Sequence, residues 1–503
     1  MKLFAFAFLL LTNSAIAQYR GYNWVIPDSA GVDFNTEPPS VFYSNLSGNK
    51  FYGPGVILRN ASCISNEQGE LLFYTNGYNV YDRNHDTMPN GSELFSAFMD
   101  YNGTVALPYP DNEDSLYLIL HTWILNAIHT QGIYYTVVNM NRRGGLGDVE
   151  AAQRNVPVYA NDSMSSQLVA VRHANGRDWW VIGRKGGQKG YIVLLVTPQG
   201  VQVNGVQDAG QDVAMWVTGQ MCANPQGTQL ALAMYSPILL GTSVDAPLIE
   251  TLDFDRCTGT LSHAQWLHPL TCYTLSYSPN GKLLYYNTYD TLFQVAGLDG
   301  SQSVTQLAVG YNPYYDPSST ASLNASFGFG AHQLGPDGKI YIAFTTFNFP
   351  NVSTYAPQNM SLCTIDSPDV QGAGCHFNLN SFYLGGKRST VGMPNMPNYN
   401  LAALAGSGCD TITTTSRTPK RTFTVDTYPN PFTSELQIRI HGLTSAAELS
   451  VTNILGQRIH QAVLTSDNGT LNNTVDMSLL PSGVYAVTIR DDRSVYTRKV
   501  VKN

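Results

Sequence analysis

The sequence predicts an all-β protein, in which a β-propeller is followed by a small Ig-like β-sandwich. Three observations predict this fold. A motif of a tight turn and an apolar strand recurs along most of the chain, and a strand-rich block of different composition ends it. Charged residues make up only 13% of the 503 residues, whereas about a quarter is usual in globular proteins. Low charge with 30 tyrosines and 44 glycines is typical of an extracellular all-β protein.

The clearest copy of the motif is SPNGKLLYY, at Ser278 to Tyr286. Its Asn280-Gly281 pair predicts a tight turn, because both residue types tolerate a positive φ at little cost. The segment from Leu283 to Tyr286 is β-favouring and apolar on both faces, which suits a strand packed between neighbouring sheets. The motif therefore predicts a turn followed by a buried strand.

Related copies recur at intervals of about fifty to sixty residues, or twice that, and such a period with several strands per repeat indicates a propeller. Several copies carry a second hairpin, so the unit contains four strands and forms one blade. Six units are expected between Ile64 and Leu384. The segments 19–62 and 381–404 would together form a closing blade, so seven blades are favoured over six. The related copies begin at Asn66, Asp111 (which lacks the glycine), Ala174, Asn224 and Gly335.

Residues 1–17 have the features of a secretory signal peptide. One lysine precedes an apolar core from Leu3 to Leu11, and an A-x-A cleavage site places the cut between Ala17 and Gln18. The apolar run is too short to cross a membrane, and no later segment is apolar enough. We therefore expect an exported chain with no transmembrane segment, whose propeller occupies residues 18–404.

The composition changes after Leu404. Residues 405–424 are rich in Ser, Thr and Gly, as expected for a flexible linker. Residues 425–503 alternate apolar and polar side chains in several runs, as half-buried strands do. This pattern predicts a small β-sandwich.

Four motifs of this block resemble the C-terminal sorting domain of type IX secretion substrates, in the subtype that opens with Pro-Asn-Pro. They are YPNPF (428–432), NILGQ (453–457), LPSGVY (480–485) and RKVVK (498–502). The resemblance implies recognition by the outer-membrane export machinery, removal of the domain, and release of the protein or its attachment to surface lipopolysaccharide. An ordinary Ig-like binding module is the alternative. The residues that carry the sorting motif are Pro429, Asn430, Pro431, Phe432, Gly483, Tyr485 and Lys499.

The propeller part is similar to large secreted propeller proteins of bacteria that use this export route. The likeness is carried by residues 65–91, 132–149, 170–182, and the stretch from Gly335 into CHFNLNSFYLGGKRSTVGMPN. It covers nearly all of residues 20–400. It implies the fold and the compartment, and it implies no particular chemistry.

The chain has seven cysteines, so at least one has no partner within the chain. Export makes disulfides possible. Cys257 and Cys272 flank the junction between two units and are the first predicted pair, and Cys363 and Cys375 bracket a loop and are the second. Buried free thiols are the alternative for several of them. Cys63 and Cys409 would tie the two ends of the ring together, and Cys222 is left as the odd residue.

Several function classes lack their sequence signals. The net charge is −8 and basic clusters are absent from the propeller part, so no nucleic-acid partner is expected. No H-E-x-x-H, C-x-x-C or G-x-S-x-G motif is present, and we predict no cofactor and no metal. The segment 82–86 faintly resembles a calcium loop but lacks the bidentate glutamate, so a polar turn is favoured. His332 precedes a predicted strand that begins a blade, and such positions can line a central channel.

Exposed aromatic rings are the preferred binding candidates, because Tyr and Trp combine apolar area with a polar tip. Tyr311, Tyr314 and Tyr315 fall in a long loop, where binding residues usually lie on a rigid scaffold. We therefore expect a surface-attached or extracellular module that binds a glycan or another surface protein without catalysis. The alternatives are a secreted enzyme that cleaves polysaccharide or peptide, and a structural part of the cell-surface apparatus.

Overall fold

The computed structural model divides the chain into two compact units, Met1–Thr411 and Ile412–Asn503, which are described separately below. Both residues of the predicted signal cleavage site, Ala17 and Gln18, lie outside the residues that the structure describes. The described residues are 19–46, 60–96, 102–126, 129–213, 219–234, 249–267, 272–288, 290–298, 300–309, 326–347, 357–410, 424–441, 446–453, 458–465, 470–490 and 495–503.

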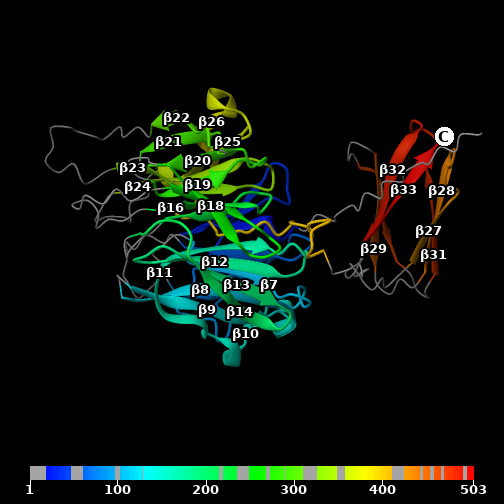
Figure 1. The fold of residues 1–503 in the computed structure, drawn as a ribbon. Helices are drawn as coiled ribbons and strands as arrows, with labels where there is room; N and C mark the ends of the chain where they lie inside the picture. Colours follow the sequence, from blue (N-terminus) through cyan, green and yellow to red (C-terminus); the bar gives the residue numbers. More distant parts are fainter. Residues whose placement is uncertain are drawn as a thin grey trace, which may run out of the picture. The chain divides into compact units, whose positions relative to one another are not determined.

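The described part of the first unit forms seven groups of antiparallel strands, which are the blades of a β-propeller (Figure 1). The fold class and the favoured number of seven blades are therefore confirmed. The strands of blades 1 to 3 are β1 (Asn23–Val25), β2 (Ala30–Asp33), β3 (Ser40–Tyr43), β4 (Ser62–Ser65), β5 (Leu71–Thr75), β6 (Val80–Asp82), β7 (Thr104–Pro108), β8 (Leu116–Asn126), β9 (His129–Asn139) and β10 (Asp148–Val149).

Blades 4 to 7 follow the same order along the chain, and short 3-10 turns are the only helices among the residues described. The strands are β11 (Val156–Arg172), β12 (Trp179–Lys185), β13 (Tyr191–Thr197), β14 (Gly200–Gln207), β15 (Met221–Ala223), β16 (Gln229–Ala233), β17 (Ile249–Phe254), β18 (Leu261–Leu267), β19 (Thr274–Tyr277), β20 (Leu283–Asn287), β21 (Thr291–Ala296), β22 (Ser303–Val309), β23 (Ser326–Leu334), β24 (Ile340–Phe347), β25 (Ser361–Ile365) and β26 (Phe377–Tyr383). The 3-10 turns are η1 (Tyr19–Gly21), η2 (Arg143–Gly145), η3 (Ala151–Gln153), η5 (Pro357–Met360) and η6 (Gly372–Cys375).

The first strand of each blade contacts the first strand of the next, which gives a ring of inner strands in the order β1, β4, β7, β11, β15, β19, β23. Strand β11 belongs to two blades. Its first half, from Val156, pairs with β9, and its second half, to Arg172, pairs with β12. Blades 3 and 4 are therefore joined in one continuous sheet.

The recurring motif is the turn between the first and second strand of a blade. In the clearest copy, the Gly281 N–H donates to the Ser278 carbonyl at 2.9 Å, and Gly281 has a φ of 73°. The strand after it, β20, is fully buried, as its apolar sequence predicts. The equivalent glycine of blade 5, Gly227, makes the same bond to Asn224 at 2.8 Å. The repeat therefore places a tight glycine turn between the first two strands of blades 2, 4, 5, 6 and 7.

Hydrophobic packing between the first and last blades closes the ring. Trp24 of β1 contacts Tyr341 of β24, with ring centroids 5.4 Å apart, and both side chains are buried. The predicted closing blade differs in detail, because the N-terminal residues alone form its three strands. The C-terminal residues add an isolated bridge, between Asp28 and Ser389. The ring is thus closed mainly by burial of apolar side chains, and not by a blade that both ends of the propeller build together.

The second unit contains two facing sheets, with strand orders β27-β28-β31 and β30-β29-β32-β33 (Figure 1). One hydrophobic core separates them, and Leu449, Val487 and Ile489 are fully buried in it. This is the predicted small sandwich, which forms because each strand alternates inward apolar and outward polar residues. The strands are β27 (Thr424–Tyr428), β28 (Glu435–His441), β29 (Ala447–Asn453), β30 (Arg458–Leu464), β31 (Thr470–Asp476), β32 (Gly483–Arg490) and β33 (Val495–Lys502).

The opening and the basic end of the sorting motif meet in space. The Phe432 N–H donates to the Val501 carbonyl at 2.9 Å, and the Asn430 side-chain oxygen accepts from the Val501 N–H at 2.8 Å. Phe432 is buried, whereas Lys499 lies in the ladder of β33 opposite Ala486. The Pro-Asn-Pro-Phe segment therefore holds the last strand in place, which gives the two ends of the motif a common structural role.

Candidate functional site in the propeller axis

Residues 389–404, here called the strap, lie inside the ring of inner strands. The strap begins at the bridge to blade 1 and then contacts the inner strands one after another. Its Val391 carbonyl accepts from the Ala331 N–H of β23 at 2.7 Å, and its Asn395 N–H donates to the Ala61 carbonyl, next to β4, at 2.7 Å. In Figure 1 the yellow-to-orange end of the propeller runs between its green and cyan halves. The strap therefore fills part of the axial channel.

Further along, the strap contacts blades 3, 4 and 5. The Tyr399 hydroxyl donates to the Ala106 carbonyl of β7 at 2.9 Å, and the Leu404 N–H donates to the Ala174 carbonyl at 2.7 Å. Glycine is required where the strap passes closest. A Cβ on Gly330 would collide with the Val391 backbone, so only glycine allows this approach.

A disulfide between Cys257 and Cys409 follows the strap and joins it to the turn after β17. The Cα atoms are 5.5 Å apart, within the range that disulfides require. The predicted pairing of Cys257 with Cys272 is therefore wrong. Cys272 is instead a buried free thiol beside Leu275 in a hydrophobic cluster.

The second and third predicted pairs are also wrong, because each of their members except Cys409 is a free, buried thiol. Cys363 lies in β25 and Cys375 lies in η6, and both belong to the hydrophobic cluster between blades 6 and 7. Cys63 lies in β4, where its thiol is 3.3 Å from the Asn23 carbonyl, and burial raises its pKa to about 12. Closeness in sequence did not identify the partner of Cys257, because the strap brings Cys409 back across 152 residues.

A cavity of about 240 Å³ lies beside the strap, between the inner strands. Its walls come from β1, β11, β15, β19, β23 and the strap itself. Aromatic side chains contribute apolar area with polar tips, and these are Tyr22, Trp24, Tyr277 and Tyr399. Amide side chains supply most of the polar lining, and these are Asn102, Gln220, Asn224, Gln333, Asn395, Asn398 and Asn400.

The residues described around this cavity include no Asp, Glu, Lys or Arg. Its titratable groups are His332, Cys222 and the three tyrosines. Burial raises the pKa of Cys222 to about 12 and lowers that of His332 to about 3, so both side chains are neutral at pH 7. The cavity therefore offers uncharged hydrogen-bonding groups and aromatic surface.

His332 lies in β23, inside the first strand of blade 7 and not before it. Its backbone N–H and carbonyl are bonded to the Gln220 side chain, at 3.1 and 2.6 Å. The imidazole is fully buried, and neither ring nitrogen has a hydrogen-bond partner among the described residues. Leaving a buried polar group unpaired costs about 1–3 kcal/mol. Ser276 on neighbouring β19 also lines the cavity with an unpaired hydroxyl.

Buried histidines make the stability of the propeller depend on pH. His121 is also fully buried, and desolvation lowers its pKa to about 4. Below about pH 6.5 the unfolded chain binds a proton on each of these rings, whereas the folded chain does not. The free energy of unfolding is therefore at its full value above pH 6.5 and decreases as the pH falls below it. Between pH 7 and pH 5 we expect each ring to lower the free energy of unfolding by about 2 kcal/mol.

Urea unfolding at pH 7, 6 and 5 measures this dependence. The His332→Gln variant should lose less stability over that range than the natural protein does. His121→Gln should likewise lose less stability between pH 7 and pH 5, because it removes the other ring whose pKa burial lowers. A flat stability profile from pH 7 to pH 5 in the natural protein would contradict the prediction.

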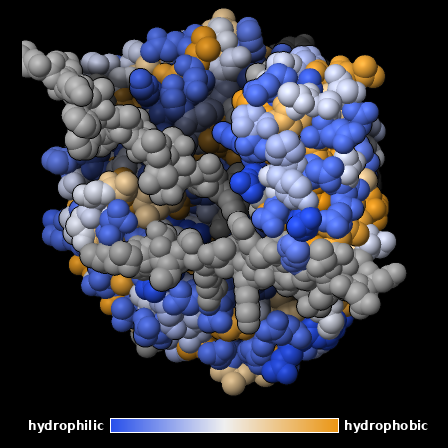
Figure 2. Space-filling view, turned by 90° about the vertical axis from the view of Figure 1, so that its right-hand side faces the viewer, coloured by the Kyte–Doolittle hydropathy of each residue, from blue (hydrophilic) through white to orange (hydrophobic). Residues whose placement is uncertain are grey.

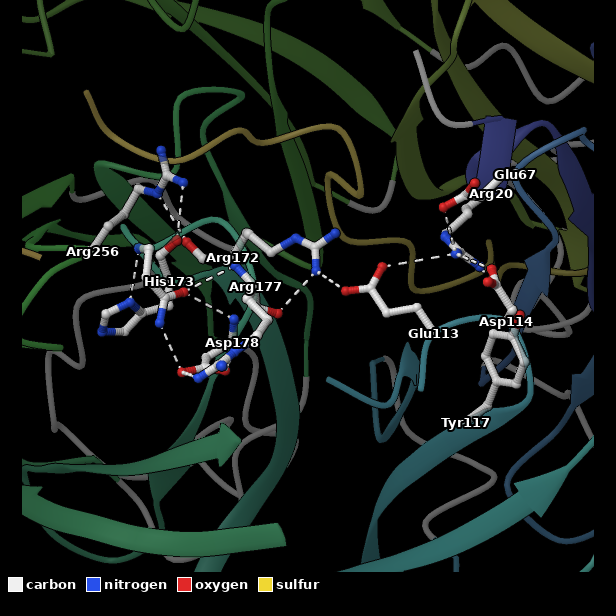
Figure 3. Close-up of polar contacts among 11 residues, drawn as sticks. Arg20, Glu67, Glu113, Asp114, Tyr117, Arg172, His173, Arg177, Asp178 and Arg256 are labelled. Carbon is white, nitrogen blue, oxygen red and sulfur yellow. Dashed lines mark hydrogen bonds and ion pairs between the residues drawn. The ribbon is translucent and has the colours of Figure 1, made fainter. Parts of the chain in front are cut away.

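Three buried arginines surround the exit of the strap (Figure 3). Arg256 donates to the Ala402 carbonyl of the strap at 2.6 Å and to the Arg172 carbonyl at 2.9 Å. Arg172 pairs with Glu113 at 2.9 Å, and Glu113 lies 3.8 Å from Arg20. These hydrogen bonds and ion pairs connect blades 1, 3, 4 and 5 to one another and to the strap. We interpret the network as structural, because Arg20 and Arg172 are paired with carboxylates and Arg256 is bonded to backbone carbonyls.

The remaining predicted residues are placed as follows. Tyr311, Tyr314 and Tyr315 lie outside the residues that the structure describes, so their role stays a prediction. Asp82, in the segment that faintly resembles a calcium loop, accepts from the Asn84 N–H at 2.9 Å and pairs with Arg143 at 3.2 Å. Within the described ranges, no group of three or more His, Cys, Asp or Glu is placed to hold a metal ion.

The strap was not found from the sequence, although one signal was available. The run MPNMPNYN, residues 393–400, contains prolines and asparagines directly after the last blade and fits no strand. It supplies Asn395 and Tyr399 to the cavity. Ser276 and Gln220 had no distinguishing signal, because Ser276 is a single polar residue within inner strand β19 and Gln220 is a single polar residue just before β15.

Comparison with known proteins identifies one part of the chain. Residues 426–503 match the family described as the secretion system C-terminal sorting domain. These residues form a type IX sorting domain. The sorting domain confirms the resemblance of the four C-terminal motifs, and it shows that the protein is secreted or attached to the cell surface. It also implies an interaction with the type IX secretion machinery.

No curated protein matches the chain. Solved structures that resemble it include the Swd1 β-propeller domain of Myceliophteria thermophila, at 10% identity over 66% of this chain and 97% of that one, with a TM-score of 0.34. A putative 6-phosphogluconolactonase from Bacteroides uniformis is 13% identical over 78% and 97%, with a TM-score of 0.30. A functionally unknown protein from Desulfotomaculum acetoxidans is 14% identical over 74% and 85%, with a TM-score of 0.32.

The surface of the protein carries no single apolar belt in the view of Figure 2, where hydrophilic residues predominate and hydrophobic ones form small, separate groups. Where the structure describes the chain, no helix is long and apolar enough to cross a membrane.

Proposed function

We propose that the propeller is a non-catalytic binding module of the cell exterior, and that its axial cavity binds an uncharged part of a glycan. The observation that carries this proposal is the lining of the cavity, which combines four aromatic rings with amide and hydroxyl groups. Aromatic faces and neutral hydrogen-bonding groups suit a sugar, which has apolar ring faces and polar edges.

The same lining argues against the alternatives that involve charge. Hydrolysis of a glycoside by acid and base requires two carboxyl groups near the bond, and the described cavity walls contain none. A phosphorylated or strongly acidic ligand would need Lys or Arg in the cavity wall, and the described lining contains neither. Removal of the sorting domain, followed by release of the protein or its attachment to surface lipopolysaccharide, remains part of this proposal.

Retention on an array of neutral polysaccharides, acidic polysaccharides and peptides tests the proposal. We expect the full chain to be retained by a neutral glycan and to leave the mass of the ligand unchanged. Tyr22→Ala, which removes a partly buried ring from the cavity wall, should weaken retention. Tyr383→Ala is the matched control, since Tyr383 is exposed on the outer strand β26.

Each other outcome identifies a different function. Cleaved ligand would show an enzyme acting on polysaccharide or peptide. Retention by peptides alone would show a protein-binding module. Absence of retention by any member of the array would contradict glycan binding and favour a structural role at the cell surface.

A further inference from the structure

Three polar atoms of the axial cavity lack partners among the described residues. They are the two ring nitrogens of His332 and the hydroxyl oxygen of Ser276. Both residues line the cavity from neighbouring inner strands, β23 and β19, which contact each other. His332 is completely buried and Ser276 is 5% exposed. Buried polar groups in native proteins almost always have partners, so these atoms point to an occupant of the cavity.

Two of the amide side chains that line the cavity already have hydrogen-bond partners within the protein. Gln220 bonds to the His332 backbone through both its oxygen and its nitrogen, and the Asn395 amide donates to the Leu168 carbonyl at 3.0 Å. These two side chains hold the cavity walls together. Among the side chains of the residues that line the cavity, the buried polar atoms without a partner in the described part of the chain belong to His332 and Ser276.

The chemistry of these groups selects the ligand. A neutral imidazole presents one donor and one acceptor, and a serine hydroxyl also donates and accepts. A carboxylate or phosphate can only accept, and an ammonium group can only donate, so each would leave part of the set unpaired. A pair of neighbouring hydroxyl groups satisfies both roles. The described lining also contains no charged side chain that would balance an ionic ligand.

We propose that His332 and Ser276 bind the hydroxyl groups of a neutral sugar ring in the axial cavity and exclude its charged analogues. This inference rests on the proposed function and deepens it, because it names the residues and the ligand class. Tyr22, Trp24 and Tyr277 line the same cavity and supply apolar surface for the faces of such a ring.

Nuclear magnetic resonance of the imidazole nitrogens tests this inference on the full chain labelled with nitrogen-15. The signals of His332 are those that disappear in His332→Gln. The probes are galactose, mannose and N-acetylglucosamine, with galacturonic acid as the charged counterpart of galactose. We expect at least one neutral sugar to shift the His332 signals to saturation, and we expect galacturonate to leave them unchanged.

Substitutions provide a second measurement. Ser276→Ala and His332→Leu should each weaken binding of that sugar by about tenfold or more, since each loses a buried hydrogen bond. His332→Gln keeps a donor and an acceptor and should retain part of the affinity. His263→Leu is the control, because His263 is exposed on β18 and should leave binding unchanged.

The possible failures are distinct. A sugar that binds while the His332 signals stay fixed would overturn this inference and leave the proposed function standing. Equal shifts with galactose and galacturonate would overturn the selection against charge. Unshifted His332 signals with every probe, together with retention of the protein on a glycan array, would place the binding site elsewhere.

Discussion

Replacement of Cys257 by serine is expected to lower the free energy of unfolding of the propeller by roughly 2–5 kcal/mol. The disulfide joins residues 152 positions apart, so it removes much of the freedom of the unfolded chain. It also ties the end of the strap to blade 5, next to the cavity that the strap helps to line. We therefore expect ligand binding in the cavity to weaken together with stability.

Denaturant unfolding of the full chain measures this effect, with an internal control. All seven cysteines lie before Thr411, so the transition of the sorting domain should not change. Dithiothreitol should shift the propeller transition of the natural protein as the substitution does, and should have no effect on the variant with both Cys257→Ser and Cys409→Ser. A natural protein that is insensitive to the reductant would contradict the prediction.

Replacement of Glu250 by glutamine should destabilise the propeller by about 3–5 kcal/mol, because it leaves a buried cation without its counter-charge. Glu250 and Arg184 are both fully buried, with Nε and Oε2 3.5 Å apart. Glu250 also accepts from the Gln211 N–H at 2.9 Å, from the Trp266 indole at 3.2 Å and from the Tyr191 hydroxyl. The carboxylate thus joins β17 to residues of blade 4 and its following loop.

A double variant distinguishes the loss of stability caused by the unpaired buried charge from the loss caused by the missing hydrogen bonds. Adding Arg184→Met to Glu250→Gln removes both charges, so stability should partly return. The exposed carboxylate of Asp208, paired with Lys189 at 3.0 Å, gives the control: Asp208→Asn should change stability by less than about 1 kcal/mol. If Glu250→Gln unfolded at the denaturant concentration of the natural protein, the pair would not have the role assigned to it.

Much of the fold could be predicted from the sequence because its signals are local. Asn280-Gly281 predicts a turn through the φ angles that it tolerates, and the apolar run from Leu283 predicts a buried strand. Six repeats of that signal, with the residues before and after them, indicate seven blades. The Pro-Asn-Pro opening and the basic end identified the sorting domain, although their contact through Phe432 and Val501 was not evident.

The candidate site could be predicted only in part. His332 was expected before an inner strand and near the channel; it lies within β23, and it is among the residues that line the cavity. The preferred aromatic candidates, by contrast, were chosen from a loop, because exposure and sequence pattern were the available criteria. The unpaired state of the His332 ring depends on which side chains surround it, and those come from strands throughout the chain.

The turn-and-strand repeat, the export of the chain and the sorting domain could be predicted from the amino acids alone, since each depends on neighbouring residues or a short motif. The course of the strap, the partner of Cys257 and the uncharged cavity around His332 depend on how the blades pack. These features join residues hundreds of positions apart. Such contacts form only when the packing of all blades compensates for the entropy lost on closing long loops. A local sequence pattern does not report the balance of these two terms.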